Sequence, residues 1–263
     1  MNNPLCADVV VQRLSPYGPL GDDHGFYVLE LENPGISSAL GGQFVMIRRP
    51  SWSSRPLWGR PFSIHRISES SLEIFFQVVG CGTRDLLELS PGDTLTLWGP
   101  LGNGFAVEAD TKTLMLAGGV GLAPFALYSE THPNPENLTL LFGHRIPLSC
   151  YPFDSLETCS LKTACQEHEP SDLDVFIADM ETHIRDHADG LVLACGPTPF
   201  LRTVKRIAEA CGARAQLSLE NKMACGVGAC LGCVCKTTEG QYTQVCTKGP
   251  VFWSTELCFD EGE

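Results

Sequence analysis

The first hundred residues alternate apolar and polar positions in short runs, which is the pattern of β-strands. The runs cover residues 9–14, 26–32, 43–49, 62–67, 72–79 and 94–98. Turn sequences such as Pro16-Tyr17-Gly18 and Pro91-Gly92-Asp93 separate them, and one short helix is expected at 83–89. Six short strands at this spacing predict a small antiparallel β-barrel.

From residue 112 the pattern changes to an alternation of strands and helices. Continuous apolar runs predict strands at 113–117, 138–142 and 191–195, with a weaker one at 161–165, and helices at 123–130 and 199–210. Apolar residues at helical spacing from Leu173 to Ile184 predict a further helix, opened by a capping box of Ser171 and Asp174. This alternation indicates an open parallel α/β sheet of the Rossmann-like, nucleotide-binding kind.

The segment from residue 216 onward has a different composition. Five of the chain's 13 cysteines lie between Cys225 and Cys246, and a sixth is Cys258. A segment this short holds only a small hydrophobic core, so a bound metal cluster would stabilise it. We therefore predict three domains, covering residues 1–108, 109–215 and 216–263.

Charge and cysteine usage narrow the class of protein. The formal net charge is −13, the wrong sign for a protein that binds nucleic acid through phosphates. The most apolar stretch, 113–128, is broken by glycines and a proline, so no membrane span is expected. The N-terminus lacks the pattern of a signal peptide, so a cytoplasmic location is expected, where an odd number of cysteines favours metal or redox use over disulfides.

Four cysteines have the spacing of an iron–sulfur site. Cys225, Cys230, Cys233 and Cys246 give C-x4-C-x2-C-x12-C, and the first three spacings are those of plant-type [2Fe–2S] ligation. Glycines between the ligands allow a tight loop whose backbone N–H groups can point at sulfur. The alternative is a structural zinc site, although Cys246 has no partner at the spacing of a zinc knuckle. Cys235 is interpreted as a packing thiol.

Two short motifs in the barrel segment indicate a flavin. In Arg60-Pro61-Phe62-Ser63 a guanidinium can pair with a pyrophosphate and a serine hydroxyl can reach a flavin ring atom. Downstream, Gly82 and Thr83 stand where a strand gives way to a short helix, and they can offer backbone N–H groups to the same phosphates. A charged strand edge followed by an ordinary turn would explain either motif alone, and their order favours flavin.

A second nucleotide loop is expected where the strand at 113–117 meets its helix. Gly119 and Gly121 would let a pyrophosphate approach the backbone, although the motif reads G-x-G-x-x-P rather than the strict dinucleotide fingerprint. Cys195 and Gly196 end another strand of the same sheet, on the side where such sheets bind ligands. Cys195 is thus either a residue facing this crevice or a small core thiol, and the sequence leaves both open.

In this order the motifs resemble the ferredoxin–NADP reductase-like superfamily, and within it the electron transfer subunits of the NAD-dependent, class B dihydroorotate dehydrogenases. Three stretches carry the narrower resemblance: Gly99-Pro-Leu-Gly-Asn-Gly-Phe105, residues 218–230 and residues 245–252. The resemblance implies that four cysteines hold the [2Fe–2S] cluster, Cys225, Cys230, Cys233 and Cys246. It implies FAD contacts from three strand and turn segments: Arg60, Pro61, Phe62, Ser63, Phe75, Phe76, Gln77, Gly82 and Thr83.

The same resemblance implies a partner and a reaction. The partner would be an FMN-containing catalytic subunit that oxidises dihydroorotate for pyrimidine (UMP) synthesis, joined with this chain in a heterotetramer. Electrons would pass from FMN to [2Fe–2S], to FAD and to NAD, because clusters carry single electrons and nicotinamide accepts a hydride. Family members tend to have an Asp- and Gly-rich nucleotide loop where this chain has residues 166–170, which leaves NAD or NADP open. The alternatives are a hydrogenase-, ferredoxin- or oxygenase-linked reductase subunit, or a zinc-stabilised binding protein.

Overall fold

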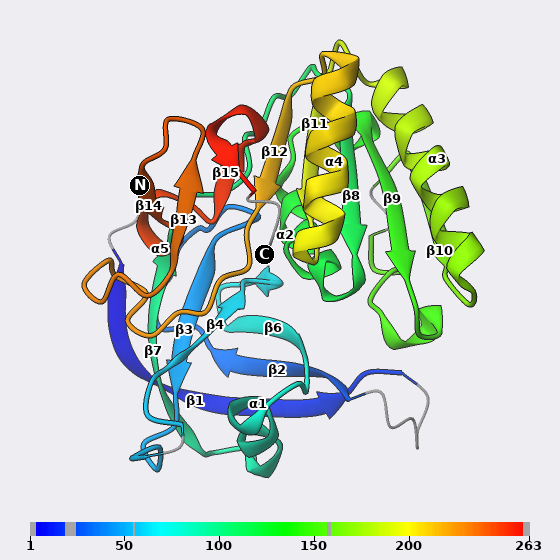
Figure 1. Cartoon of the computed structure of the whole chain (residues 1–263). Coiled ribbons are helices and arrows are strands. Elements are labelled where there is room, and N and C mark those ends of the chain that lie inside the picture. The colour runs from blue at the N-terminus through cyan, green and yellow to red at the C-terminus, as the bar shows by residue number, and fades with distance from the viewer. Residues whose placement is uncertain (1–3, 19–24, 55, 157–158, 260–263) are drawn as a thin grey trace.

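The computed structural model describes residues 4–18, 25–54, 56–156 and 159–259. Figure 1 shows an N-terminal group of strands at the bottom and left, a parallel sheet with its helices at the upper right, and a small C-terminal part at the upper left. No helix among the described residues is long and apolar enough to cross a membrane.

The N-terminal part is one antiparallel sheet of seven strands. Their order is β4-β3-β7-β1-β2-β6-β5, with these bounds: β1 Leu5–Pro16, β2 Phe26–Glu32, β3 Phe44–Arg48, β4 Arg60–Ser63, β5 Arg66–Ile67, β6 Ser71–Gln77 and β7 Thr94–Leu101. The sheet curls until β4 approaches β6, where the rings of Phe62 and Phe76 lie edge to face at 5.6 Å. Apolar side chains fill the enclosed space, as the alternation along these strands predicts.

Two elements of this part differ in detail from the expectation. The single strand expected at 62–67 is divided into β4 and β5, because the chain changes partner: the Ile64 N–H still bonds to Gln43, just before β3, whereas the His65 N–H bonds to Glu73 of β6. The short helix α1, Cys81–Asp85, begins two residues before the expected position and is followed by a 3-10 turn at Leu86–Glu88. The Thr83 hydroxyl closes this turn by accepting hydrogen bonds from the N–H groups of Val79 and Gly80, at 2.9 and 3.0 Å.

The second part is a six-stranded sheet in the order β10-β9-β8-β11-β12-β15. Five strands are parallel: β8 Thr113–Gly118, β9 Leu138–His144, β10 Leu161–Gln166, β11 Leu191–Cys195 and β12 Ala215–Ser218. Helices α3 (Pro170–Asp186) and α4 (Thr198–Cys211) cover one face, and α2 (Ala123–Thr131) covers the face toward the N-terminal sheet (Figure 1). Alternate side chains of β8 point to opposite faces of the sheet, so Leu114 packs with α3 and α4 while Met115 packs with α2.

The expected capping box of α3 is wrong. The helix begins at Pro170, two residues before the start that a Ser171 cap requires, because the fixed backbone angle of proline suits a first helical residue. The Asp172 carboxylate supplies the cap instead, accepting hydrogen bonds from the N–H groups of His168 and Glu169 at 2.8 and 3.0 Å.

The C-terminal part is a three-stranded sheet with a short helix. The strands are β13 Val234–Thr237, β14 Tyr242–Gln244 and β16 Leu257–Cys258, in the order β14-β13-β16, and the helix is α5 Val245–Lys248. Between α5 and β16 the chain adds strand β15, Val251–Trp253, antiparallel to β12 at the edge of the second sheet. The antiparallel and parallel sheets confirm the predicted fold class, while the three domain boundaries stay predictions.

Candidate functional site

The two predicted halves of the flavin site lie against each other. The Arg60 side chain, on β4, packs on Gly82 in the first turn of α1, where an added Cβ would lie 2.9 Å from the Arg60 Nε. The guanidinium also lies over the ring of Trp52 at 5.8 Å and donates to the carbonyls of Trp58 and Gly59. The Arg60 guanidinium and the backbone N–H groups in the first turn of α1 together form a set of hydrogen-bond donors that fits a pyrophosphate.

The other predicted flavin residues divide between two environments. Phe76 is 2% exposed and packs inside the barrel against Phe62, so its side chain is not available to a ligand. Phe75 points to the opposite face of β6, where it stacks on Phe26 at 5.5 Å near α2. Pro61 and Ser63, half-buried, lie on the face of β4 opposite Arg60, and Gln77 ends β6 half-buried. Because the Thr83 hydroxyl is engaged in its own turn, only its backbone can serve phosphate.

The two predicted nucleotide loops meet at the carboxyl edge of the parallel sheet. Gly121 lies so close to the carbonyl of Cys195 that an added Cβ would overlap it, whereas a Cβ added at Gly196 would lie 2.7 Å from Phe200 Cδ1 and 3.2 Å from the Gly118 backbone. Gly119 differs, because it has φ +55° and no atom lies within 4 Å of where its Cβ would be. The structure therefore brings Gly119, Gly121, Cys195 and Gly196 together and leaves backbone accessible at Gly119, as a bound pyrophosphate requires.

Two further polar residues lie at this edge that the sequence analysis did not single out. Ser218 is the register neighbour of Cys195 on β12, and Glu220 follows two residues later. Burial, with the nearby Glu220 charge, raises the pKa of Cys195 to about 12 despite a hydrogen bond from Ser218. Glu220 is exposed as a residue, and desolvation by the surrounding protein raises its pKa. Ser218 ends β12, which adjoins β11, and Glu220 follows it. Polar residues at the carboxyl end of such a strand are the sequence signal that could have identified both as site candidates.

The four predicted cluster ligands form two adjoining pairs. Cys225 and Cys230 share a side-chain hydrogen bond, and so do Cys233 and Cys246. Cys233 and Cys246 are buried, whereas Cys230 is exposed. Within the described residues, no three His, Cys, Asp or Glu side chains converge as they would on one metal ion. Two thiol pairs fit a cluster with two irons, each held by two thiolates, better than they fit a single zinc ion.

Backbone N–H groups surround the first ligand. Burial raises the pKa of Cys225, but the N–H groups of Val227, Cys230 and Ala229, with the Cys230 thiol, outweigh it and lower the pKa to about 7. Burial and the neighbouring Cys233 raise the pKa of Cys246 to about 12. Donors aimed at sulfur are the environment expected for a [2Fe–2S] loop, so the residues present fit that group.

Two of the stretches that carried the family resemblance lie side by side and anchor the last ligand. The Asn103 side chain donates to the carbonyl of Val251 at 2.7 Å and accepts from its N–H at 3.0 Å. The Asn103 N–H also bonds to the carbonyl of Gly249, at 2.7 Å. These bonds fix the segment after Cys246 to the end of β7, and Cys246 lies beside Cys233.

Comparison with known proteins identifies a family model for the C-terminal part. Residues 220–258 match the iron–sulfur cluster binding domain of dihydroorotate dehydrogenase B. An electron transfer subunit of dihydroorotate dehydrogenase B (NAD(+)) from Caldanaerobacter subterraneus subsp. tengcongensis is 34% identical over 221 residues, which cover 83% of this chain and 87% of that protein. The homologue of this subunit in Aquifex aeolicus is 35% identical over 220 residues, covering 82% and 85%.

Solved structures agree on the fold. The NADH-dependent reduced ferredoxin–NADP oxidoreductase, an electron-bifurcating flavoprotein, superposes with a TM-score of 0.81 at 23% identity and covers 96% of this chain and 90% of that one. The ferredoxin reductase of carbazole 1,9a-dioxygenase gives 0.63 at 18% identity, covering 80% and 67%. The comparisons support the predicted cofactors FAD, [2Fe–2S] and NAD, and the predicted oxidoreductase class. Relatives with over 30% identity across most of the chain show that it belongs to the family of dihydroorotate dehydrogenase B (NAD(+)) electron transfer subunits.

Proposed function

We propose that this chain is the electron transfer subunit that links an FMN-containing dihydroorotate dehydrogenase catalytic subunit to NAD+ in pyrimidine synthesis, within a heterotetramer. The two thiol pairs, on a segment that Trp98 joins to the same sheet as the predicted flavin strand β4, are the observation that carries the proposal. FAD and a [2Fe–2S] cluster, when bound, would supply the exchange between single electrons and the hydride of nicotinamide.

The chain's own residues have separate tasks in this proposal. Arg60, set on Gly82, holds the FAD pyrophosphate, and Pro61 and Ser63 lie where β4 faces the rest of the cofactor. Gly119 admits the NAD pyrophosphate to the backbone at the sheet edge, and Gly121 lets this loop pack on Cys195. Cys225, Cys230, Cys233 and Cys246 hold the cluster, as proposed ligands from one loop and one helix.

Glu220 and Cys195 would serve the nicotinamide end of the site. Both groups have raised pKa values, so the thiol stays protonated at neutral pH and the carboxyl titrates above its ordinary range. A protonated thiol can donate a hydrogen bond to a ligand without adding charge, and the Glu220 carboxyl can accept one.

Reconstitution tests the proposal. The chain is expressed with a class B catalytic subunit, purified anaerobically, and NADH formation is followed after dihydroorotate and NAD+ are added. NADH should form only when both chains are present. A Cys230→Ser variant should lose this coupled activity and still oxidise NADH with an artificial dye. A chain that carries flavin and iron and reduces dyes, yet never couples to dihydroorotate, would refute the assigned partner.

A further inference from the structure

The cluster loop (residues 223–233) lies on one face of the antiparallel sheet, and the predicted flavin strand β4 contributes Pro61 to the same face. In the ladder, Pro61 of β4 pairs with Met46 of β3, and Met46 pairs with Trp98 of β7. Directly paired residues point to the same face, so these three side chains form one row across three neighbouring strands. The row spans two strand spacings, about 10 Å.

The cluster loop rests on this row. Gly226, with φ +71°, lies so close to the sheet that an added Cβ would be 2.6 Å from the Met46 Cγ and 3.0 Å from the Leu101 Cδ1. Met46 has no exposed surface. The buried Met46 side chain therefore contacts the cluster loop and is also the ladder neighbour of Pro61 on β4.

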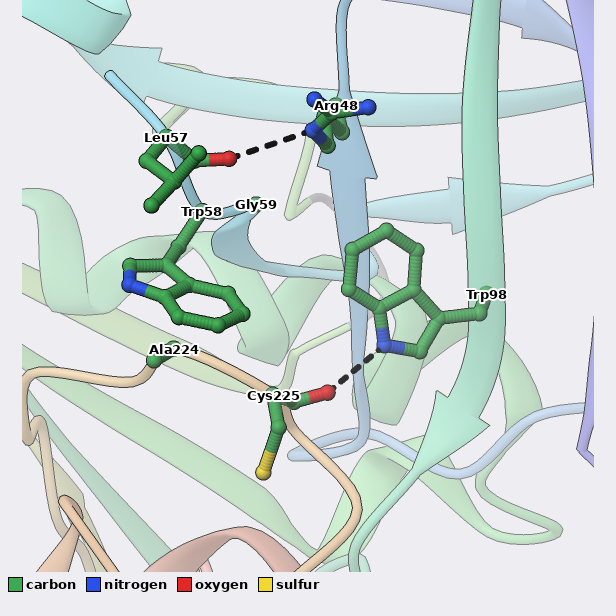
Figure 2. Close-up of a pocket in the computed structure, with 7 residues that line it drawn as sticks. All are labelled: Arg48, Leu57, Trp58, Gly59, Trp98, Ala224 and Cys225. Carbon is green, nitrogen blue, oxygen red and sulfur yellow. Dashed lines mark hydrogen bonds between the residues drawn. The ribbon is translucent and has the colours of Figure 1, made fainter. Parts of the chain in front are cut away.

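Trp98 connects the row to a proposed cluster ligand. Its indole Nε1–H donates to the carbonyl oxygen of Cys225 at 2.9 Å, from a strand 127 positions earlier in the chain. Figure 2 shows the Cys225 carbonyl turned toward Trp98 and the Sγ turned away from it. The far edge of the same indole lies against Gly59, the residue before Arg60, so closely that no side chain would fit there.

An open pocket lies beside this bridge. It has a volume of about 330 Å³ and is lined by Trp58 and Trp98 on opposite sides, with Cys225 beneath them (Figure 2). Trp58 is 55% exposed, whereas Trp98 is half-buried and packs with the core beneath the cluster segment. The two tryptophans thus share one pocket but differ in whether they are tied to the cluster loop.

We propose that Trp98 is a positioning residue, whose hydrogen bond to Cys225 holds the cluster loop at a fixed separation from the flavin strand. The inference rests on the proposed function and adds to it the residue that sets the separation of its two redox centres. One bond fixes the backbone of the first ligand, and Gly226 on Met46 fixes the next residue. Electron exchange between two centres weakens as they move apart, so loosening the attachment of the loop to Trp98 and Met46 slows exchange while the four thiols and the flavin strand are retained.

The test compares Trp98→Phe with Trp58→Phe in the full chain carrying flavin and cluster. Iron release to a chelator should be about fivefold faster in Trp98→Phe, the factor that the loss of one ordinary hydrogen bond gives. The EPR spectrum of the reduced cluster should change shape, and reduction of the cluster by NADH should slow. NADH oxidation with a dye should persist in both variants, and Trp58→Phe should match wild type throughout.

Each result decides one question. Iron release, EPR spectrum and cluster reduction that are the same in the two variants would overturn the role of Trp98. A wild-type chain that shows flavin but no [2Fe–2S] signal would overturn the proposed function itself.

If Trp98→Phe does not fold, which a loss of dye activity would reveal, the variants Gly226→Ala and Gly228→Ala test the proposal instead. Both glycines have positive φ, but an added Cβ meets Met46 of the sheet at Gly226 and Thr247 of the C-terminal segment at Gly228. Slower cluster reduction in Gly226→Ala than in Gly228→Ala supports the proposal that the contact of Gly226 with Met46 positions the loop, and equal rates overturn it.

Discussion

His65 should make the protein lose stability in mildly acidic solution. It follows the flavin strand, is 1% exposed, and its Nδ1 lies 2.8 Å from the carbonyl oxygen of Ala123 at the start of α2. A neutral ring can donate this bond. Burial, opposed by the Ala123 carbonyl and aided by the Arg66 charge, lowers the pKa of His65 from 6.5 to about 4.

The size of the effect follows from proton linkage. The unfolded chain binds a proton near pH 6.5 and the folded chain only near pH 4, so the contribution is complete above pH 6.5 and is lost as pH falls from 6.5 to about 4. At pH 5 the unfolded state is favoured by a proton-binding factor of about 30, which corresponds to about 2 kcal/mol.

Urea unfolding at pH 7.5 and pH 5.0 measures this loss. A His65→Gln variant lacks the titrating group, so wild type should lose about 2 kcal/mol more than the variant between the two pH values. A His168→Gln variant, changed at an exposed histidine, should behave like wild type. Equal losses in wild type and His65→Gln would refute the reasoning, because carboxylates would then account for the whole dependence.

Three other substitutions test the nucleotide sites. Arg60→Ala should weaken FAD binding about tenfold through the loss of a charge-assisted hydrogen bond, and flavin retention on dialysis measures this loss. The control Arg13→Ala, which removes an exposed ion pair, should retain the flavin. Gly121→Ala should destabilise the chain by about 1–3 kcal/mol, because the new methyl group overlaps the Cys195 carbonyl, and should raise the KM for NADH. Gly119→Ala, in open space at φ +55°, should destabilise the chain by about 1 kcal/mol. The reverse order of the two losses of stability would contradict the loop packing. Because burial raises the Glu220 pKa, Glu220→Gln should remove an ionisation above pH 4.5 from the pH profile of NADH oxidation with a dye, and an unchanged profile would exclude that carboxyl.

Strands and helices with strong local patterns were predictable from the sequence. Residues 26–32 and 191–195 are strands with the predicted bounds, because alternating or continuous apolar runs already determine which side chains are buried. The cysteine spacing likewise predicts a loop that places four thiols together, and the structure brings them into two pairs.

Long-range pairing was not predictable in this way. Strands β12, β15 and β16 have four residues or fewer, and their strand character comes from partners distant in sequence rather than from periodicity. The same is true of Trp98, which reads as an ordinary strand residue until the ladder places it beside Cys225. Ser218 and Glu220 belong to no motif, and only the position of β12 in the sheet makes them candidates.

The edge strand β15 has a consequence for how the protein is made in the cell. The strand that covers β12 comes from residues 251–253, after the fourth cysteine, so this segment must be synthesised before the nucleotide sheet can be completed. Until then β12 presents an unpaired edge, which is a template for association with other chains.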